Sequence, residues 1–472
     1  MASVTGVSPT GVFEQPDFER QSVIAYDPRP ARSQSTNVHI AADRNLGSWA
    51  RVERYNNFGG LRTGLHGDGD LKWLSTLKLR CLKVWIAVGD PQRYHDYLRS
   101  AESVSEEVMI NVGTGQTARD PAQSLDAFTR ELYEFLLAIK RNHPKVVWVE
   151  CLNEYRPRSG DWRDPNRFDE YFAFFESFRV AVDRVNRELS PERPLLLGGP
   201  VTTQFSEVWF HELLDRLDQK SLSIDFLSYH QYLFHRMRGR PARIRPERAV
   251  LSGMLERRGI NPRSMPMFVT EIGVFPGGPY QNTGEFDADL VTQAAGILSS
   301  NYWYIEQADG DARRGSPLPF QWVTRHGQHA WKNQLVADRD GVPTPQGHAL
   351  RLLSLLHRDR LAAASDAIDA DGVGVYVLAT GGPAAVSALL WNYQWIDGRT
   401  THEVTVRLTG VEAGDWKLRQ YAIDDAHSNH RKGYASSGPE LVQQTSVSIE
   451  PDTSAIRLSL PINGIALIQL SR

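Results

Sequence analysis

The sequence lacks several features that would each place it in a well-known class of protein. It has only 2 cysteines in 472 residues, Cys81 and Cys151, too few for a disulfide framework in a chain of this length. Both lie in apolar segments, so we expect buried thiols without a bridge. No run approaches the ~18 apolar residues that a membrane helix needs. Residues 1–13 show neither the basic start nor the apolar stretch of a signal peptide. We therefore expect a cytoplasmic protein without a membrane partner.

An excess of charge of either sign is also missing. Lys and Arg total 53, Asp and Glu total 56, and the net charge is −3. Because proteins dedicated to nucleic acids usually carry a clear basic excess, we expect no nucleic-acid partner. The sequence also has no Gly-rich phosphate turn after a first strand, no zinc-type spacing of His and Cys, no calcium loop and no Gly-x-Ser-x-Gly elbow. We expect neither a metal nor another cofactor.

What the sequence does contain is an alternation of apolar runs with stretches of helical spacing. Leu79–Val88 is typical of a buried strand, whereas Phe168–Leu189 repeats apolar residues every three or four positions, as a helix does. Further strands are expected at Glu107–Val112, Val146–Leu152, Leu195–Gly198, Ile224–Tyr229, Met267–Thr270 and Leu318–Val323, with helices at Leu125–His143 and near 206–218, 246–258 and 287–307. Apolar strands that alternate with helices indicate a parallel sheet buried on both faces.

The number of these units predicts an α/β fold, the (β/α)8 TIM barrel. If a first strand lies near Asn37–Ile40, about eight strand–helix units fit within residues 36–356, and such a barrel typically needs ~250 residues or more. A doubly wound open sheet is the alternative, but it usually carries a Gly-rich turn after its first strand. We therefore favour the barrel, ending with a helix at Pro345–Leu356.

The pattern changes after this helix to short strands separated by turns, with little helical spacing. About 115 residues of this kind suggest a C-terminal antiparallel β-sandwich domain over residues 357–472. Candidate strands are Val375–Leu378, Ala385–Tyr393, His402–Leu408, Trp416–Ile423, Ser446–Ile449 and Ile465–Leu470. The N-terminal segment, residues 1–35, is irregular, and we expect it to pack with the sandwich and to add an edge strand.

Two glutamates stand where a barrel enzyme would place its catalytic groups, at the carboxyl ends of strands. Glu154 follows the strand Val146–Leu152, and Glu271 follows the strand Met267–Thr270. If these are strands four and seven, the carboxylates face each other across the barrel mouth. Glycoside hydrolysis needs such a pair, one protonated to assist the leaving group and one ionised to attack or to activate water.

The motifs around these strand ends resemble glycoside hydrolase family 39 of clan A, the family of β-xylosidases and α-L-iduronidases. The similarity extends over roughly residues 120–430. It is carried by WVECLNEY, LLLGGP, DFLSYHQY, MFVTEIG and FQWVT in this order, by PTPQGHALRLLSLL at 343–356 and by YAIDDAHSN at 421–429. Tyr155 stands where the family usually has proline after Asn-Glu, and the residues after Glu271 differ from those of the β-xylosidases, which leaves the sugar open.

The resemblance implies roles for several residues. Glu154 would be the acid/base and Glu271 the nucleophile of a retaining mechanism. The residues that would line the sugar subsite are Asn153, His230, Tyr232 and Trp322. Our reading of the strand Leu79–Val88 adds Trp85, which lies near its end, as a further candidate for substrate binding.

Six arginines crowd the segment after His230, at positions 236, 238, 240, 243, 245 and 248. A loop that follows a barrel strand lies on the catalytic face, where a positive rim would attract anionic ligands. This suggests an acidic glycan as substrate. The competing interpretation is a solvated loop whose arginines pair with acids or contact another subunit.

These observations predict a retaining glycosidase, exo-acting and β-xylosidase-like, with an oligosaccharide or glycoside as its substrate. Two alternatives stay open. One is an endo-acting or acidic-glycan-directed glycosidase of a bacterial or plant polysaccharide. The other is a non-catalytic carbohydrate-binding protein on a barrel scaffold. A homo-oligomer is also left open.

Overall fold

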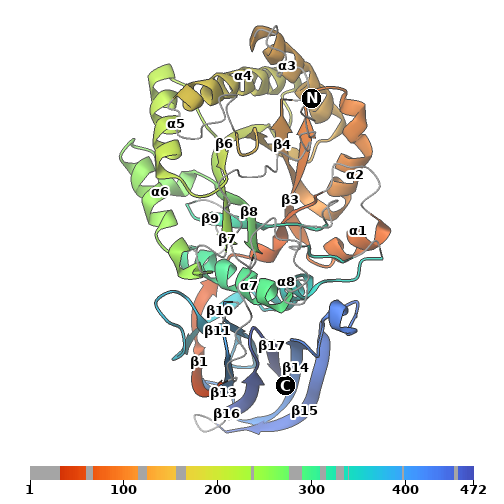
Figure 1. Ribbon diagram of the computed structural model, residues 1–472, viewed down its shortest axis with the longest axis vertical. Helices are drawn as coiled ribbons and strands as arrows, with labels where there is room; N and C mark the ends of the chain where they lie inside the picture. Colours follow the sequence, from red (N-terminus) through yellow and green to blue (C-terminus); the bar gives the residue numbers. More distant parts are fainter. Residues whose placement is uncertain are drawn as a thin grey trace, which may run out of the picture.

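The computed structural model describes residues 32–59, 67–114, 125–155, 166–234, 239–275, 290–308, 315–325, 334–337, 340–395, 398–450 and 455–472. Their strands form two sheets, a closed barrel and an open sheet of nine strands, which lie at opposite ends of the molecule (Figure 1). None of the helices in this described part is both long enough and apolar enough to span a membrane.

The barrel consists of eight parallel strands arranged in chain order. Their bounds are Tyr55–Asn57 (β2), Leu79–Ala87 (β3), Ser105–Gly113 (β4), Val146–Cys151 (β5), Leu196–Thr202 (β6), Phe226–Phe234 (β7), Met267–Phe275 (β8) and Pro317–Gln321 (β9). The last strand closes on the first through the pair Asn56–Gln321. The predicted (β/α)8 barrel is therefore confirmed, and the open-sheet alternative is wrong.

Eight helices surround this barrel within the described residues (Figure 1). They are Asp68–Ser75 (α1), His95–Val104 (α2), Leu125–Asn142 (α3), Asn166–Leu189 (α4), Glu207–Lys220 (α5), Glu247–Glu256 (α6), Leu290–Gln307 (α7) and Pro345–Ser354 (α8). The start of α8 illustrates how sequence sets these bounds, because the Thr344 side chain accepts a hydrogen bond from the Gly347 amide and Pro345 fills the first helical position.

The expectation of a first barrel strand near Asn37–Ile40 is wrong. These residues belong to Arg32–Ser48 (β1), which lies in the nine-stranded sheet between two of its other strands. Val38 and Ile40 are buried while His39 is exposed, the alternation of a strand with one buried face. The true first strand, β2, reads Tyr-Asn-Asn. Its polar side chains gave no apolar run that the sequence analysis could detect.

The nine-stranded sheet confirms the predicted β-sandwich and corrects the expected strand direction, because one of its strand pairs is parallel. Besides β1 it contains Asp359–Ser365 (β10), Gly374–Gly382 (β11), Ala385–Tyr393 (β12), Thr400–Thr409 (β13), Gly414–Ile423 (β14), Glu440–Ile449 (β15), Ala455–Leu460 (β16) and Ile465–Ser471 (β17). The pairs among β10–β17 are antiparallel, but β1 runs parallel to β13, so the sheet is mixed. Arg32–Ser35 pair with Thr400–Glu403 inside the sheet, away from its edges. Residues 1–31 lie outside the described part, and the limits of the domains stay a prediction.

The central strands of this sheet are buried on both faces. In β12, Ala388 and Leu390 belong to the core of the sandwich, whereas Leu389 and Trp391 belong to the core shared with the barrel. Trp391 donates from Nε1 to Oγ of Ser299 in α7, 2.8 Å away. Helices α7 and α8 lie between barrel and sheet in Figure 1. The two parts therefore pack as one continuous structure.

Candidate active site

The two glutamates come together at the mouth of the barrel. Glu154 lies three residues beyond β5, the fourth barrel strand, and Glu271 lies within β8, the seventh. Leu152 and Glu154 both have positive φ, 63° and 45°, so the chain turns sharply where the strand ends, and the amide of Glu154 is fixed by a 3.0 Å hydrogen bond to the carbonyl of Val201. One oxygen of each carboxylate and one ring nitrogen of His230 all lie within 4.8 Å of one another.

His230 stands between the two carboxylates. It lies on β7 directly opposite Glu271 in the sheet register. Its Nδ1 is 2.7 Å from Oε1 of Glu154 and 3.4 Å from Oε2 of Glu271. The ring is fully buried, and burial lowers the pKa of His230 to about 4. At neutral pH the ring is therefore uncharged and acts through hydrogen bonds alone.

Glu271 is contacted by a hydroxyl group and by an ammonium group. The hydroxyl of Tyr232 donates to its Oε2 at 2.5 Å, and Nζ of Lys83 lies 3.5 Å from its Oε1. Burial nevertheless raises the pKa of Glu271, while His230, Lys83 and Tyr232 oppose this rise. A positive charge and a hydroxyl donor thus lie beside Glu271, but in the unliganded protein desolvation outweighs their effect on its pKa.

The aromatic and amide candidates lie around these carboxylates. Trp322 directly follows β9 and meets Trp85 of β3 edge to face, with 5.2 Å between ring centroids. The ring of Tyr232 is 6.5 Å from that of Trp322. Asn153 directly precedes Glu154 in the chain. Oδ1 of Asn153 and Nε1 of Trp85 are buried, and neither makes a hydrogen bond within the described residues. Both atoms are suited to polar groups of a ligand.

The sequence analysis missed two charged residues inside the barrel, next to this site. Lys83 in β3 and Glu150 in β5 are fully buried and form an ion pair of 2.9 Å. Nδ2 of Asn111 in β4 donates to the same oxygen of Glu150 at 3.1 Å. Burial acts to raise the pKa of Glu150, but Lys83 and His230 together hold it below its ordinary value. The available signal was a charged residue in the middle of an apolar strand, since such a residue needs a partner.

The same three groups could in principle hold a metal ion, because Glu154, His230 and Glu271 offer ligand atoms within 4.8 Å. Two features of this centre disfavour a cation. Nδ1 of His230 is engaged with Glu154, and the ammonium group of Lys83 already brings positive charge to within 3.5 Å of Glu271. The arrangement fits proton transfer and nucleophilic attack better than metal binding.

Three of the six arginines after His230 make contacts within the protein. Arg240 pairs with Asp371 of the sandwich at 3.3 Å, and the guanidinium of Arg245 stacks on the ring of Trp303 at 3.9 Å. Arg248 donates to the carbonyl of Gly315 at 2.8 Å. Gly315 precedes β9, so Arg248 lies at the end of the barrel opposite to the carboxylates. For these three arginines the interpretation as an anionic-ligand rim is wrong. Arg243 is exposed, while Arg236 and Arg238 lie outside the described residues.

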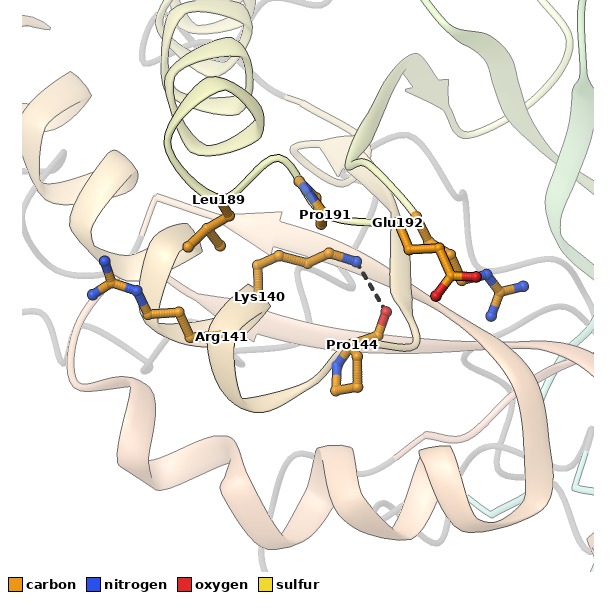
Figure 2. Close-up of a pocket in the computed structure, with 7 residues that line it drawn as sticks. Lys140, Arg141, Pro144, Leu189, Pro191 and Glu192 are labelled. Carbon is orange, nitrogen blue, oxygen red and sulfur yellow. Dashed lines mark hydrogen bonds between the residues drawn. The ribbon is translucent and has the colours of Figure 1, made fainter.

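A cavity of about 330 Å³ opens between the ends of α3 and α4 (Figure 2). It is lined by Lys140, Arg141, Pro144, Leu189, Pro191, Glu192 and Arg193, and Nζ of Lys140 donates to the carbonyl of Pro144 at 2.9 Å. Pro144 and Arg193 precede β5 and β6, so this cavity lies at the amino ends of the strands. It has no part in the site of Glu154 and Glu271.

Fold and site together define a (β/α)8-barrel protein with a sandwich domain and a carboxylate pair at the ends of strands four and seven. No family model matches the chain. It is 25% identical over 236 aligned residues to a β-xylosidase of Caldicellulosiruptor saccharolyticus. The alignment covers 47% of this chain and 43% of that protein. The chain thus matches less than half the length of this curated relative.

Solved structures share the fold over nearly the whole chain. A bacterial orthologue of human α-L-iduronidase has a TM-score of 0.69 at 14% identity, covering 93% of this chain and 84% of the other. A GH39 enzyme from Xanthomonas axonopodis pv. citri has a TM-score of 0.63 at 15% identity, covering 94% and 99%. The chain therefore shares its fold with a solved GH39 enzyme and an α-L-iduronidase orthologue, and its sequence is similar to that of a β-xylosidase over less than half of the chain.

Proposed function

We propose that this protein is a retaining glycoside hydrolase of the β-xylosidase type that releases single sugars from chain ends. The observation that carries the retaining part of the proposal is the close approach of Glu154 and Glu271, of which one carboxylate oxygen each lies within 4.8 Å of the other. Retaining glycosidases hold their carboxyl groups ~5–5.5 Å apart, whereas inverting enzymes need ~6.5–9.5 Å to admit a water molecule between sugar and base. The described geometry supports the first class.

The contacts of the two carboxylates support a division of roles. The hydroxyl of Tyr232 and the ammonium group of Lys83 lie beside Glu271. Both groups favour the ionised form of Glu271 when a substrate displaces water. Glu154 lies closer to solvent, with 14% of its side chain exposed against 5% for Glu271, where a leaving group and then a water molecule can approach it. We assign Glu271 as the nucleophile and Glu154 as the acid/base.

The reaction then follows two displacements. Glu271 attacks the anomeric carbon while Glu154 gives its proton to the glycosidic oxygen, so the leaving group departs as an alcohol and a glycosyl ester forms on Glu271. Glu154, now ionised, takes a proton from water, whose oxygen attacks the anomeric carbon and releases Glu271. Both steps pass through transition states of oxocarbenium character. The sugar keeps its anomeric configuration.

The neighbouring side chains suit recognition of a sugar. Asn153 can hydrogen-bond a hydroxyl beside the anomeric carbon, and such a bond strengthens in the transition state. Trp85 and Trp322 offer apolar surface to a sugar ring, and Nε1 of Trp85 can donate to a hydroxyl. The β-xylosidase named among the relatives supports a pentoside as the first substrate to test.

A panel of nitrophenyl glycosides, including the β-xyloside and the β-glucoside, together with xylo-oligosaccharides, whose sugar leaving groups are poor, tests the proposal. We expect Glu154→Gln to lower kcat/KM by about 10²–10⁴-fold on substrates with poor leaving groups, because proton transfer is lost. Glu271→Gln should lower it by about 10³-fold or more on every substrate, because no ester can form. Glu207→Gln, an exposed acid at the start of α5, is the matched control and should leave activity unchanged. Full activity in both active-site variants would contradict the proposal.

A carbohydrate-binding protein without catalysis is the outcome if no glycoside is cleaved while sugars still bind. Isothermal titration with xylo-oligosaccharides would then show binding that does not depend on Glu154 and Glu271. Comparing monosaccharide with oligosaccharide products separates exo from endo action. Rates that rise on uronate-bearing substrates at low ionic strength would favour the acidic-glycan alternative.

A further inference from the structure

The proposed chemistry uses two glutamates, but a lysine of β3 also contacts several groups of the site. Nζ of Lys83 lies 3.5 Å from Oε1 of Glu271 and 3.4 Å from Nε2 of His230. It also lies 5.1 Å from the centre of the Trp85 ring. Its side chain is fully buried, so it cannot reach out to a substrate as a surface lysine would.

Glu150 holds this lysine in place. The 2.9 Å ion pair between them is fully buried on both sides, and Asn111 fixes the same carboxylate oxygen from the adjacent strand. A buried cation is costly unless an anion and further hydrogen bonds compensate it. The strands β3, β4 and β5 therefore supply an anchor that keeps the ammonium group beside the catalytic pair.

The lysine also determines where the hydrogen of the neutral His230 ring lies. An ammonium group can only donate hydrogen bonds, so its partner Nε2 must offer a lone pair. The single ring hydrogen is then on Nδ1, which faces Oε1 of Glu154 at 2.7 Å. We assign this tautomer from the hydrogen-bond network. In it His230 donates to Glu154.

We propose that Lys83 is a positioning residue for both glutamates, anchored by Glu150. Its charge stabilises the carboxylate form of Glu271, and its hydrogen bond to His230 keeps the Nδ1 hydrogen directed at Glu154. The inference rests on the proposed function, because it assigns Lys83 a part in preparing the nucleophile and the acid/base.

The charged and titratable groups that face Glu271 come from three strands and one loop. They are Lys83 from β3, Glu150 from β5, Glu154 from the turn after β5, and His230 and Tyr232 from β7. Within the described residues the ion pairs of Glu271 are those with Lys83 and His230, and the His230 ring is neutral at working pH. The titration of Glu271 should therefore respond chiefly to Lys83.

The test is the pH profile of kcat/KM for wild type, Lys83→Met and Lys83→Arg. Because an opposite charge at this distance typically lowers a carboxyl pKa by about 1–3 units, we expect Lys83→Met to move the acid limb up by that amount. We also expect it to lower kcat at the optimum while KM changes little. Lys83→Arg keeps the charge and should restore the wild-type limb. Glu150→Gln removes an anion near Glu271 and should move the limb in the opposite direction. A purely structural role would not produce opposite shifts.

Lys417→Met, on the exposed side of β14, is the matched control and should leave the profile unchanged. An acid limb that stays in place in Lys83→Met would overturn the inference. If Lys83→Met does not fold, the double variant Lys83→Met/Glu150→Gln removes both charges of the pair. The acid limb of the double variant should still lie at a higher pH than that of wild type. An acid limb at the pH of wild type would also overturn the inference.

A measurement without substrate separates this inference from the proposed function. In Lys83→Met, Glu150 and Glu271 lose their cation, so their folded-state pKa values rise and the variant loses stability as pH increases. The gap between its thermal midpoint and that of wild type should therefore widen from pH 5 to pH 8. If wild type cleaves no glycoside but the gap widens, the proposed function fails and the ion-pair network stands. A constant gap contradicts the inference itself.

Discussion

Nδ1 of His230 lies 2.7 Å from Oε1 of Glu154, joining the sixth barrel strand to the turn after the fourth. The same nitrogen is 3.4 Å from Oε2 of Glu271 on the seventh strand. One uncharged ring thus connects both carboxylates across the barrel mouth. Its hydrogen bond orients Glu154 without adding a charge, which suits a carboxyl group that must alternate between acid and base.

Removing this hydrogen bond is the first prediction. His230→Phe keeps an aromatic ring in the buried position but cannot donate to Glu154. Because hydrogen bonds to charged groups contribute about 1.5–3 kcal/mol, we expect kcat on the substrate of the wild type to fall about 10–100-fold. KM should change less than kcat. Steady-state kinetics with a nitrophenyl glycoside measures both.

His39→Phe in β1, where the histidine is exposed, is the control for this substitution and should retain full activity. Circular dichroism would verify that both variants fold. A kcat for His230→Phe within twofold of wild type would show that the contact with Glu154 does not contribute to catalysis.

The second prediction concerns the separate roles of the two glutamates. With azide present, Glu271→Ala should regain activity on a β-glycoside and form the α-glycosyl azide, because azide attacks in place of the missing nucleophile. Glu154→Ala should instead give the β-glycosyl azide, because azide replaces the activated water after the glycosyl ester has formed. Proton NMR of the products identifies the anomers.

Opposite anomers from the two variants would support the assignment of nucleophile and acid/base. The same anomer from both, or exchanged anomers, would contradict it. Azide added to wild type should leave the rate nearly unchanged, which controls for effects of the salt itself.

The sequence predicted the barrel because most of its strands contain apolar runs and its helices have strong periodicity. It missed the first strand, since Tyr-Asn-Asn carries no hydrophobic signal and the partners of Asn57 come from strands that are distant in sequence. Nδ2 of Asn57, for example, donates to the carbonyl of Thr270 at 3.1 Å. The alternating strand around Val38 was assigned to the wrong sheet because local pattern does not state which strands become neighbours.

Candidate catalytic residues could be predicted where they follow the end of a strand. Contacts that depend on packing across the barrel could not be predicted. Glu154 and Glu271 could be found from their positions alone. The pair of Lys83 and Glu150 joins residues from two strands that lie far apart in sequence, and only the closed sheet brings them within 2.9 Å. Chain position alone was also a poor guide for Arg248, because it indicated the catalytic face, while Arg248 contacts Gly315 at the opposite end of the barrel.

A buried glutamate outside the site provides the third prediction. Glu247 accepts hydrogen bonds from Tyr229 at 2.5 Å and from Tyr304 at 2.8 Å, and burial raises its pKa to about 7. Because the folded protein holds this proton more tightly than the unfolded chain, Glu247 costs stability as pH rises from about 4.5 to 7. The shift from 4.5 to about 7 corresponds to at most about 3 kcal/mol.

Glu247→Gln removes this titration but keeps an acceptor for the two hydroxyls. We expect the variant to be more stable than wild type at pH 8 and no more stable at pH 5, as measured by urea unfolding followed by tryptophan fluorescence. Glu256→Gln, at the exposed end of the same helix, should not alter the pH dependence. Parallel curves for wild type and Glu247→Gln from pH 5 to 8 would rule out a raised pKa for Glu247.

The last prediction tests whether barrel and sandwich depend on each other. Trp391 is 1% exposed, stacks on Tyr376 with 5.0 Å between ring centroids and donates to Ser299 of α7. Replacing a fully buried tryptophan with alanine typically costs about 3–5 kcal/mol. Since this ring fills the space between the two parts, we expect Trp391→Ala to weaken α7 as well as the sandwich. Hydrogen exchange followed by mass spectrometry should show faster exchange in residues 290–307.

Trp416→Ala is the matched control, because Trp416 is buried to a similar degree, 2% exposed, in the separate core of the sandwich. It should speed exchange in the nine-stranded sheet and leave α7 protected. Helix α7 follows β8, which carries Glu271, and Gly296 of α7 packs closely enough on Val274 of β8 that an added Cβ would lie 2.9 Å from its side chain. Weakening α7 through Trp391 should therefore reach the strand of the proposed nucleophile. If both tryptophan variants leave residues 290–307 equally protected, the sandwich does not stabilise the barrel. Its contact with α7 would then not influence the candidate active site.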